Sequence, residues 1–201
     1  MKGETMKIID ILENDKWIRS YDFFDDFMKS SYYENLIDSY HRLNREILFD
    51  SHVHGPDHIE RVIFFSHLLS FLNDLDFYDL DVLRNAASLH DTKRRNDRYD
   101  PSHGPRAAIE SIGYSYARDE DKKILQAVIA AHSPEDRAMD KIITNFIDPR
   151  DDFVRAKFLA ELFKDADGLD RVRINHLDPR YLRNIHSKSL VDFSYELFKR
   201  F

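Results

Sequence analysis

The sequence predicts an all-α protein that folds as one domain. Apolar residues recur at helical spacing along the whole chain, and no alternating strand pattern extends beyond a few residues. Glycine and proline, which interrupt helices, number only 5 and 6 among 201 residues. Apolar residues make up 42% of the chain, enough to predict a packed core. We therefore expect a helical bundle of roughly eight to ten helices.

Each expected helix is marked by its own apolar stripe. Gly55-Pro56 separates the second from the third, because proline suits the first turn of a new helix. The segment Met139–Asp152 fits a short helix, a proline-containing loop and a new helix start. In chain order, the expected helices cover residues 8–12, 33–47, 59–72, 80–90, 106–116, 124–132, 158–166 and 181–197. We assign residues 1–50 to N-terminal helices, 51–175 to the core and 176–201 to a C-terminal helix.

Composition excludes several classes of function. The chain has no cysteine, which excludes disulfides, cysteine-ligated zinc and thiol nucleophiles. A net charge of -7 argues against an extended nucleic-acid surface. No apolar run approaches the ~20 residues that a membrane span needs. Asp10, Glu13 and Asp15 interrupt the apolar part of the N-terminus, so it does not resemble a signal peptide, and a cytoplasmic protein is expected.

Four polar residues align with the apolar faces of expected helices: His58, His90, His132 and Asp167. A buried polar group without a partner costs roughly 2–7 kcal/mol, so these residues need partners, and each other is one choice. Together with Asp91 they offer three imidazoles and two carboxylates, which suit a first-row divalent ion. Each residue alone also fits a hydrogen-bonded core histidine or a helix cap. Spacing alone leaves the metal site and the structural roles equally open.

The stretch from Ser88 to Pro105, SLHDTKRRNDRYDPSHGP, has two interpretations. Alone, it is typical of a charged turn after a helix. Placed between His58 and Asp167, it contains half of a metal site, followed by basic residues that would hold an anionic substrate.

Five segments in order resemble the HD-domain superfamily of metal-dependent phosphohydrolases. HGPDHIERV is similar to that family's HGxxHxxRV opening, and His90-Asp91 matches the doublet for which the family is named. LHDTKRRNDRYDPSHG places Arg94, Asp97, Asp100 and His103 where one subgroup has them. VIAAHS, KDADGLDRVR and the later LDPRYLR continue the pattern. The chain departs from it at Lys93, where glycine is common, and over 139–155, which is longer and more charged.

The resemblance implies an all-α bundle of the HD-domain type around a divalent ion. The implied ligands are His58, His90, Asp91 and Asp167, and the ion is Mn, Fe, Co, Ni, Zn or Mg. Asp91 with His103 and His132 would hold a second ion. With one ion, His103 and His132 would instead bind phosphate or protonate the leaving group.

The same resemblance predicts a hydrolase that cleaves a small phosphorylated substrate, such as a nucleotide. Asp91 would orient or deprotonate the attacking water, and Arg94 would neutralise charge on the phosphoryl oxygens. Lys93 would support Arg94, and His54 would touch the substrate or an inner ligand. A solvated loop histidine is an equally open interpretation of His54. Asp170 is expected to pair with Arg171 or with a neighbouring helix.

Two other functions stay open. A di-iron oxygenase of similar fold would use all six residues, namely His58, His90, Asp91, His103, His132 and Asp167. A catalytically silent module would use the same site to sense a nucleotide or a metal. The sequence decides neither the ester, the number of ions nor the oligomeric state.

Overall fold

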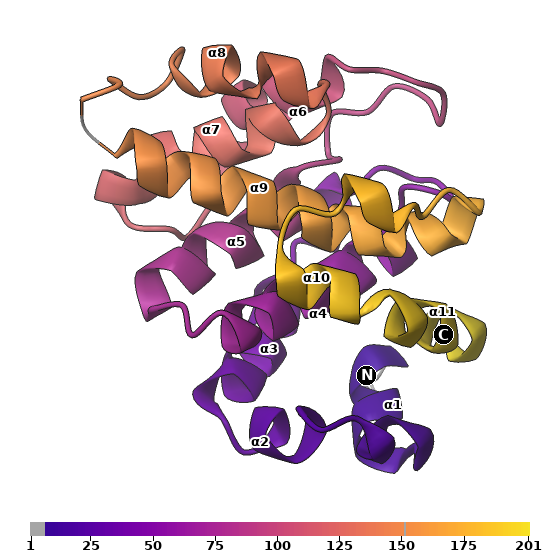
Figure 1. Ribbon diagram of the computed structural model, residues 1–201. Coiled ribbons are helices and arrows are strands. Elements are labelled where there is room, and N and C mark those ends of the chain that lie inside the picture. The colour runs from indigo at the N-terminus through magenta and orange to yellow at the C-terminus, as the bar shows by residue number, and fades with distance from the viewer. Residues whose placement is uncertain (1–6, 151) are drawn as a thin grey trace.

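The computed structural model describes residues 7–150 and 152–201, and over these residues it contains helices and no strands (Figure 1). The prediction of an all-α fold is confirmed. The α-helices are α1 (Lys7–Asn14), α2 (Phe24–Met28), α3 (Ser31–Arg42), α4 (Pro56–Leu72), α5 (Phe77–Leu89), α6 (His103–Glu110), α7 (Lys122–His132), α8 (Met139–Ile143), α9 (Phe153–Leu169), α10 (Ile185–Ser189) and α11 (Val191–Arg200). Short 3-10 helices are η1 (Trp17–Ser20), η2 (Arg45–Ile47), η3 (Ile112–Tyr114), η4 (Asp119–Asp121), η5 (Asp136–Ala138), η6 (Asp170–Ile174) and η7 (Pro179–Tyr181).

The central helix is α4, which packs against α3, α5 and α9. All residues from His58 to Ser70 are buried, as expected for a helix enclosed on every side. The long helix α9 passes beside α4, α5 and α7, and α6 covers the other side of α7 (Figure 1). Over the described residues, no helix combines the length and the apolar character that crossing a bilayer requires.

Two helix boundaries in particular differ from the sequence prediction. The helix expected from residue 106 begins at His103. Pro105 is tolerated there because it lies in the first turn, where backbone N–H groups have no partner within the helix. The helix expected over 33–47 ends at Arg42, and η2 follows. The short elements η1 and α2 were not predicted, and residues 1–6 lie outside the described residues.

The C-terminal segment is not the single helix that was predicted. It forms η7, α10 and α11. The buried carboxylate of Asp165 accepts hydrogen bonds from the backbone N–H groups of Arg183 and Asn184. These bonds hold the chain extended between η7 and α10, and the Asn184 side chain then caps α10. The ambiguous segment before α9 does contain a short helix, α8, a loop and a new start; Asp151 lies outside the described residues.

His67 on α4 predicts an acid-sensitive core. Its ring is fully buried, Nδ1 donates to the Ile63 carbonyl, and burial lowers its pKa to about 4. Unfolded histidine titrates near 6.5, so between pH 6.5 and about 4 only the unfolded chain takes up this proton. The contribution of His67 to the free energy of unfolding is therefore complete above pH 6.5. It decreases as the pH falls, by about 2 kcal/mol at pH 5.

Urea unfolding at pH 7 and pH 5 measures this effect. We expect the loss between the two pH values to be about 2 kcal/mol smaller in His67→Gln than in the parent, because the other histidines contribute equally to both proteins. An equal loss in the two proteins would contradict the prediction.

Candidate metal centre

Five helices bring the predicted ligands to one place. His58 lies in the first turn of α4, and His90-Asp91 follows the last turn of α5. His103 begins α6 and His132 ends α7, while Asp167 lies in the last turn of α9. Helix termini leave backbone groups unpaired and turn abruptly, so side chains there can point across the bundle.

The first cluster contains His58, His90, Asp91 and Asp167. Nε2 of His58 lies 3.2 Å from Nε2 of His90, 3.5 Å from Oδ2 of Asp91 and 3.4 Å from Oδ1 of Asp167. His90 Nε2 is 3.7 Å from the same Asp91 oxygen. Two nitrogens and two carboxylate oxygens thus converge, which is a donor set suited to a divalent ion.

The second cluster lies on the other oxygen of the same carboxylate. Asp91 Oδ1 is 2.9 Å from His103 Nε2 and 3.8 Å from His132 Nε2, and these two nitrogens are 2.7 Å apart. Asp91 therefore stands between two pairs of imidazoles, with one oxygen directed at each pair. If two ions were bound, Asp91 could contribute one oxygen to each.

Hydrogen bonds on the outer side of each ring determine which nitrogen carries the proton. Nδ1 of His90, His103 and His132 lies against the carbonyl oxygens of Ala87, Asp100 and Ile129. A carbonyl can only accept, so each Nδ1 carries hydrogen and each Nε2 presents a lone pair to the centre of the cluster. Nε2 of His103 and His132 would then repel across 2.7 Å, and a cation between them removes the repulsion. The donor set therefore fits a metal ion.

Electrostatics keeps the ligands in the protonation states that bind metals. Burial lowers the pKa of His90 to about 3, and burial also lowers the pKa of His103. Burial alone would raise the pKa of Asp91 and Asp167, but the neighbouring histidines outweigh it and hold both pKa values below the usual range. At neutral pH the rings of His90 and His103 are thus neutral and the carboxylates of Asp91 and Asp167 ionised, the forms that bind a metal ion.

Asp170 supports the centre from behind. Its carboxylate is fully buried; it accepts from His58 Nδ1 at 2.7 Å and from Arg61 Nε at 2.5 Å. Arg173 adds a contact at 3.4 Å. The neighbouring helix α4, and not Arg171, supplies its main partners. A carboxylate behind a ligating histidine fixes the ring and strengthens it as a donor.

Of the three residues predicted to contact substrate, Arg94 and His54 contact Asp91 and Lys93 does not. Arg94 Nε donates to Asp91 Oδ1 at 2.9 Å, and His54 Nδ1 is 3.0 Å from Asp91 Oδ2. Lys93 Nζ is at the surface, 3.8 Å from Glu110. None of the three belongs to the described lining of the pocket that opens on the metal centre.

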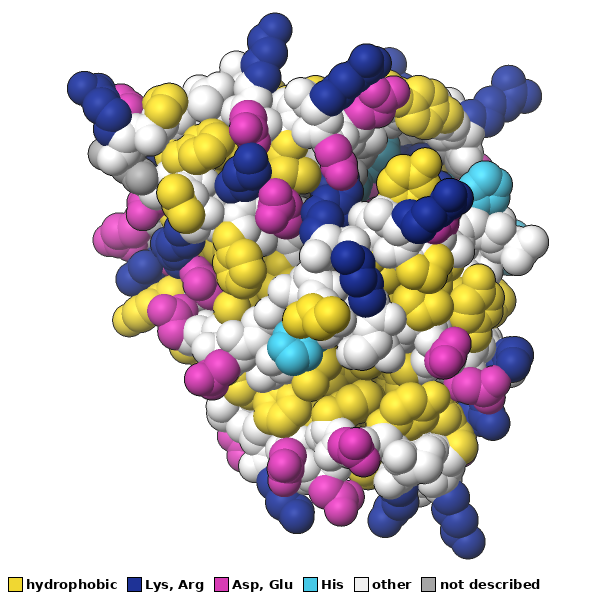
Figure 2. Space-filling model, in the orientation of Figure 1, with side chains coloured by type: hydrophobic (Ala, Val, Ile, Leu, Met, Phe, Trp, Pro, Cys, Tyr) yellow, Lys and Arg dark blue, Asp and Glu magenta, His cyan; other side chains and the backbone are white. Residues whose placement is uncertain are grey.

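That pocket has a volume of about 900 Å³ and reaches His132 and Asp167 at its inner end. Asp167 is the most accessible of the six clustered residues, with 23% of its side chain exposed. Lysine and arginine side chains lie around the recess over the C-terminal half of α9, with aspartate and glutamate side chains between them (Figure 2). Lys164 and Gly168 of the floor share the face of α9 on which Asp167 lies, and helical spacing in the sequence could have indicated both. Arg171 follows in η6. Residues of the segment 175–183 line the pocket across from α9, and the sequence did not indicate that this segment lies there.

We found no family model, no curated protein and no solved structure that matches this chain. The resemblance to the HD-domain superfamily therefore stays a prediction from the motifs, and the geometry of the side chains carries the functional argument.

Proposed function

We propose that this protein is a metal-dependent phosphohydrolase of the HD-domain type, which cleaves a phosphate ester of a small molecule such as a nucleotide. One observation carries the proposal: a buried carboxylate, Asp91, lies between two pairs of inward-facing imidazoles, beside a pocket whose lining includes Lys164 and Arg171. Divalent ions with open positions and cationic side chains are the groups that phosphoryl transfer uses.

In this proposal His58, His90, Asp91 and Asp167 hold one ion, and Asp91, His103 and His132 hold another. A bound ion acts as a Lewis acid and lowers the pKa of its water. Asp167 stands at the pocket side, where a substrate enters.

Other side chains prepare the substrate and the carboxylate. Lys164, whose side chain lines the pocket on the face of Asp167, neutralises charge on the phosphoryl oxygens. We assign this contact to Lys164 in place of Lys93 and Arg94, because the latter two lie outside the described lining. Arg94 and His54 act through Asp91, whose two oxygens they contact and orient.

Turnover of phosphate esters tests the proposal. The protein loaded with Mn²⁺ is expected to release phosphate or alcohol from an aryl phosphate, a bis-aryl phosphate or a member of a nucleotide panel. His90→Ala should lower the rate by at least about 100-fold, since a lost ligand costs no less than a lost outer partner. His41→Ala, at an exposed position on α3, should leave it unchanged. Folded, metal-loaded protein that cleaves none of these esters would contradict the hydrolase and favour a binding module.

A di-iron oxygenase is the second candidate, because the six clustered residues also supply donors for two irons around one carboxylate. Oxygen uptake by the di-ferrous protein, measured with the same candidate substrates, separates the two activities. Phosphate release without oxygen uptake would eliminate the oxygenase.

A further inference from the structure

We propose that the segment 175–183 forms a subsite for a planar ring in the substrate, with Tyr181 as its specificity-determining residue and Lys164 and Arg171 as its anion contacts. The juxtaposition of this aromatic wall with Lys164 of α9 and Arg171 of η6, beside Asp167, carries the inference. It rests on the proposed function and deepens it: the preferred ester joins phosphate to a flat ring system.

The pocket floor is one face of α9. Lys164, Asp167 and Gly168 lie on that face, with Lys164 one turn before Asp167, and Arg171 follows in η6, four residues after Asp167. A phosphoryl group at Asp167 therefore has a cation on each side along the helix axis.

Lys164 is held ready to bind an anion. Only 9% of its side chain is exposed, and its ammonium donates to the Pro134 carbonyl at 2.6 Å and to Asp136 at 2.9 Å. An ammonium has three N–H groups, so the third remains for the pocket that the side chain lines.

The charges around the pocket cancel in pairs, except at Arg171. Arg137 pairs with Glu135, Arg183 with Asp136 and Asp165, and Asp178 with Arg180. Within the described residues Arg171 has no carboxylate partner. Its Nε donates to the His176 carbonyl at 3.3 Å, which anchors the guanidinium and leaves both terminal nitrogens for a ligand. An anchored guanidinium is a strong site for phosphate oxygens.

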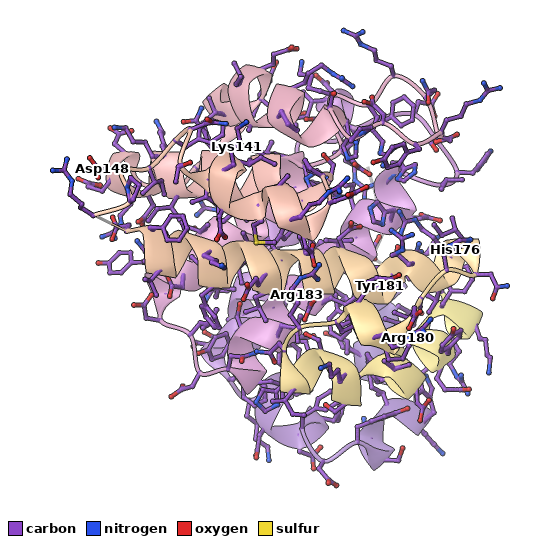
Figure 3. All side chains as sticks on the ribbon, turned by 45° about the horizontal axis from the view of Figure 1, so that its top comes forward. Lys141, Asp148, His176, Arg180, Tyr181 and Arg183 are labelled. Atoms are coloured by element: carbon purple, nitrogen blue, oxygen red, sulfur yellow. The ribbon has the colours of Figure 1, made fainter. Side chains whose placement is uncertain are left out.

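The wall opposite this floor offers an aromatic and apolar surface. Leu177, Tyr181 and Leu182 belong to the lining, and Tyr181 is 72% exposed. Figure 3 shows His176, Tyr181 and Arg183 in succession beside the C-terminal half of α9. A large exposed aromatic side chain at the mouth of a charged pocket provides the stacking surface that planar rings use.

Several contacts make this wall rigid before any ligand arrives. Asp178 caps η7 by accepting from the Arg180 backbone, and Arg183 is bonded to the buried Asp165. Leu182 packs on Gly168, where an added Cβ would come within 3.3 Å of its Cδ2. Because the wall is already ordered, the protein loses little conformational entropy when a ligand binds. A stacking contact at this wall therefore contributes to the affinity.

Paired substrates test the subsite. Adenosine 5′-monophosphate carries a ring and glycerol 3-phosphate carries none. Tyr181→Ala is expected to lower kcat/KM for the nucleotide about tenfold, in line with the loss of one stacked base, and to leave the glycerol ester within about twofold. Tyr181→Phe should retain the parent value for both. Arg171→Gln should lower kcat/KM for both esters, because it removes a phosphate contact.

Binding provides a second readout that does not depend on turnover. Calorimetry with the methylene phosphonate analogue of the nucleotide, which cannot be hydrolysed, should show Kd about tenfold weaker in Tyr181→Ala than in the parent. Tyr99→Ala, at a 79% exposed tyrosine outside the described lining, is the matched control and should change nothing.

The two proposals fail in different ways. If Tyr181→Ala affects both esters equally or neither, or leaves the Kd of the phosphonate unchanged, the subsite is wrong, although hydrolysis stands. If the protein binds the phosphonate through Tyr181 but cleaves no ester, the subsite stands and the hydrolase is wrong.

Discussion

Asp91→Asn is expected to release every ion that the protein holds, whereas His132→Ala is expected to release only one of two. The reason is the position of the Asp91 carboxylate, which directs Oδ2 at His58 and His90 and Oδ1 at His103 and His132. Neutralising it removes a charge from both clusters at once. His132 contacts the second cluster on Oδ1 of Asp91, so its loss spares the four donors of the first.

Elemental analysis of purified, folded protein measures the ion content per chain. We expect the content of Asp91→Asn to approach zero and the affinity for Mn²⁺ to fall by at least about 100-fold. His41→Ala serves as the control, because it removes an exposed histidine and no ligand. If the parent protein holds one ion per chain and His132→Ala still holds it, His132 would contact the substrate or the leaving group and not the metal. Full ion content in Asp91→Asn would contradict the shared carboxylate.

Asp170→Asn is expected to weaken the fold and the metal centre together. The Asp170 carboxylate is buried against His58, Arg61 and Arg173. Burial alone would raise its pKa, but His58 and Arg61 outweigh that effect and hold the pKa below the usual range. Removal of one partner from a buried ion pair leaves the other charge unsatisfied, at a cost of about 3–5 kcal/mol. Loss of the bond to His58 Nδ1 frees that ring and should lower metal affinity about 10- to 100-fold.

Urea unfolding of the metal-free protein and a Mn²⁺ titration of the folded protein separate these two effects. Asp178→Asn is the matched control, because Asp178 forms an ion pair with the exposed Arg180 and lies away from His58. We expect the control to unfold at nearly the same urea concentration as the parent and to bind Mn²⁺ with the same affinity. If Asp170→Asn unfolds at a lower urea concentration than the parent but binds Mn²⁺ with the same affinity, Asp170 stabilises the fold and does not support the metal centre.

The helices were predictable where one apolar stripe runs without interruption. Five stripes of this kind became α4, α5, α7, α9 and α1, each within a few residues of its expected bounds. The predictions were wrong where a single long-range contact decides the backbone. Asp165 of α9 holds the backbone of Arg183 and Asn184 extended. The apolar periodicity of residues 176–201 gives no sign of a contact with Asp165.

The candidate ligands were predictable because burial restricts polar residues strongly. A histidine or aspartate on an apolar helix face must find a partner, and this requirement pointed to His58, His90, His132 and Asp167, although spacing alone left structural roles equally open. The same reasoning could not find the role of Asp170. It lies just beyond α9, and only the packing of η6 against α4 brings it to His58 and Arg61.

Local sequence thus determines the helical class of this protein and the identity of its clustered histidines and aspartates, since helical periodicity and the cost of burying polar groups act over a few neighbouring residues. The tertiary structure decides which oxygen of Asp91 faces which imidazoles and which cations reach the pocket. In the folded protein Lys93 lies outside the described pocket lining, and Lys164, Arg171 and Tyr181 belong to it. These relations join residues far apart in the chain, and the packing of five helices, which no local pattern encodes, fixes their distances.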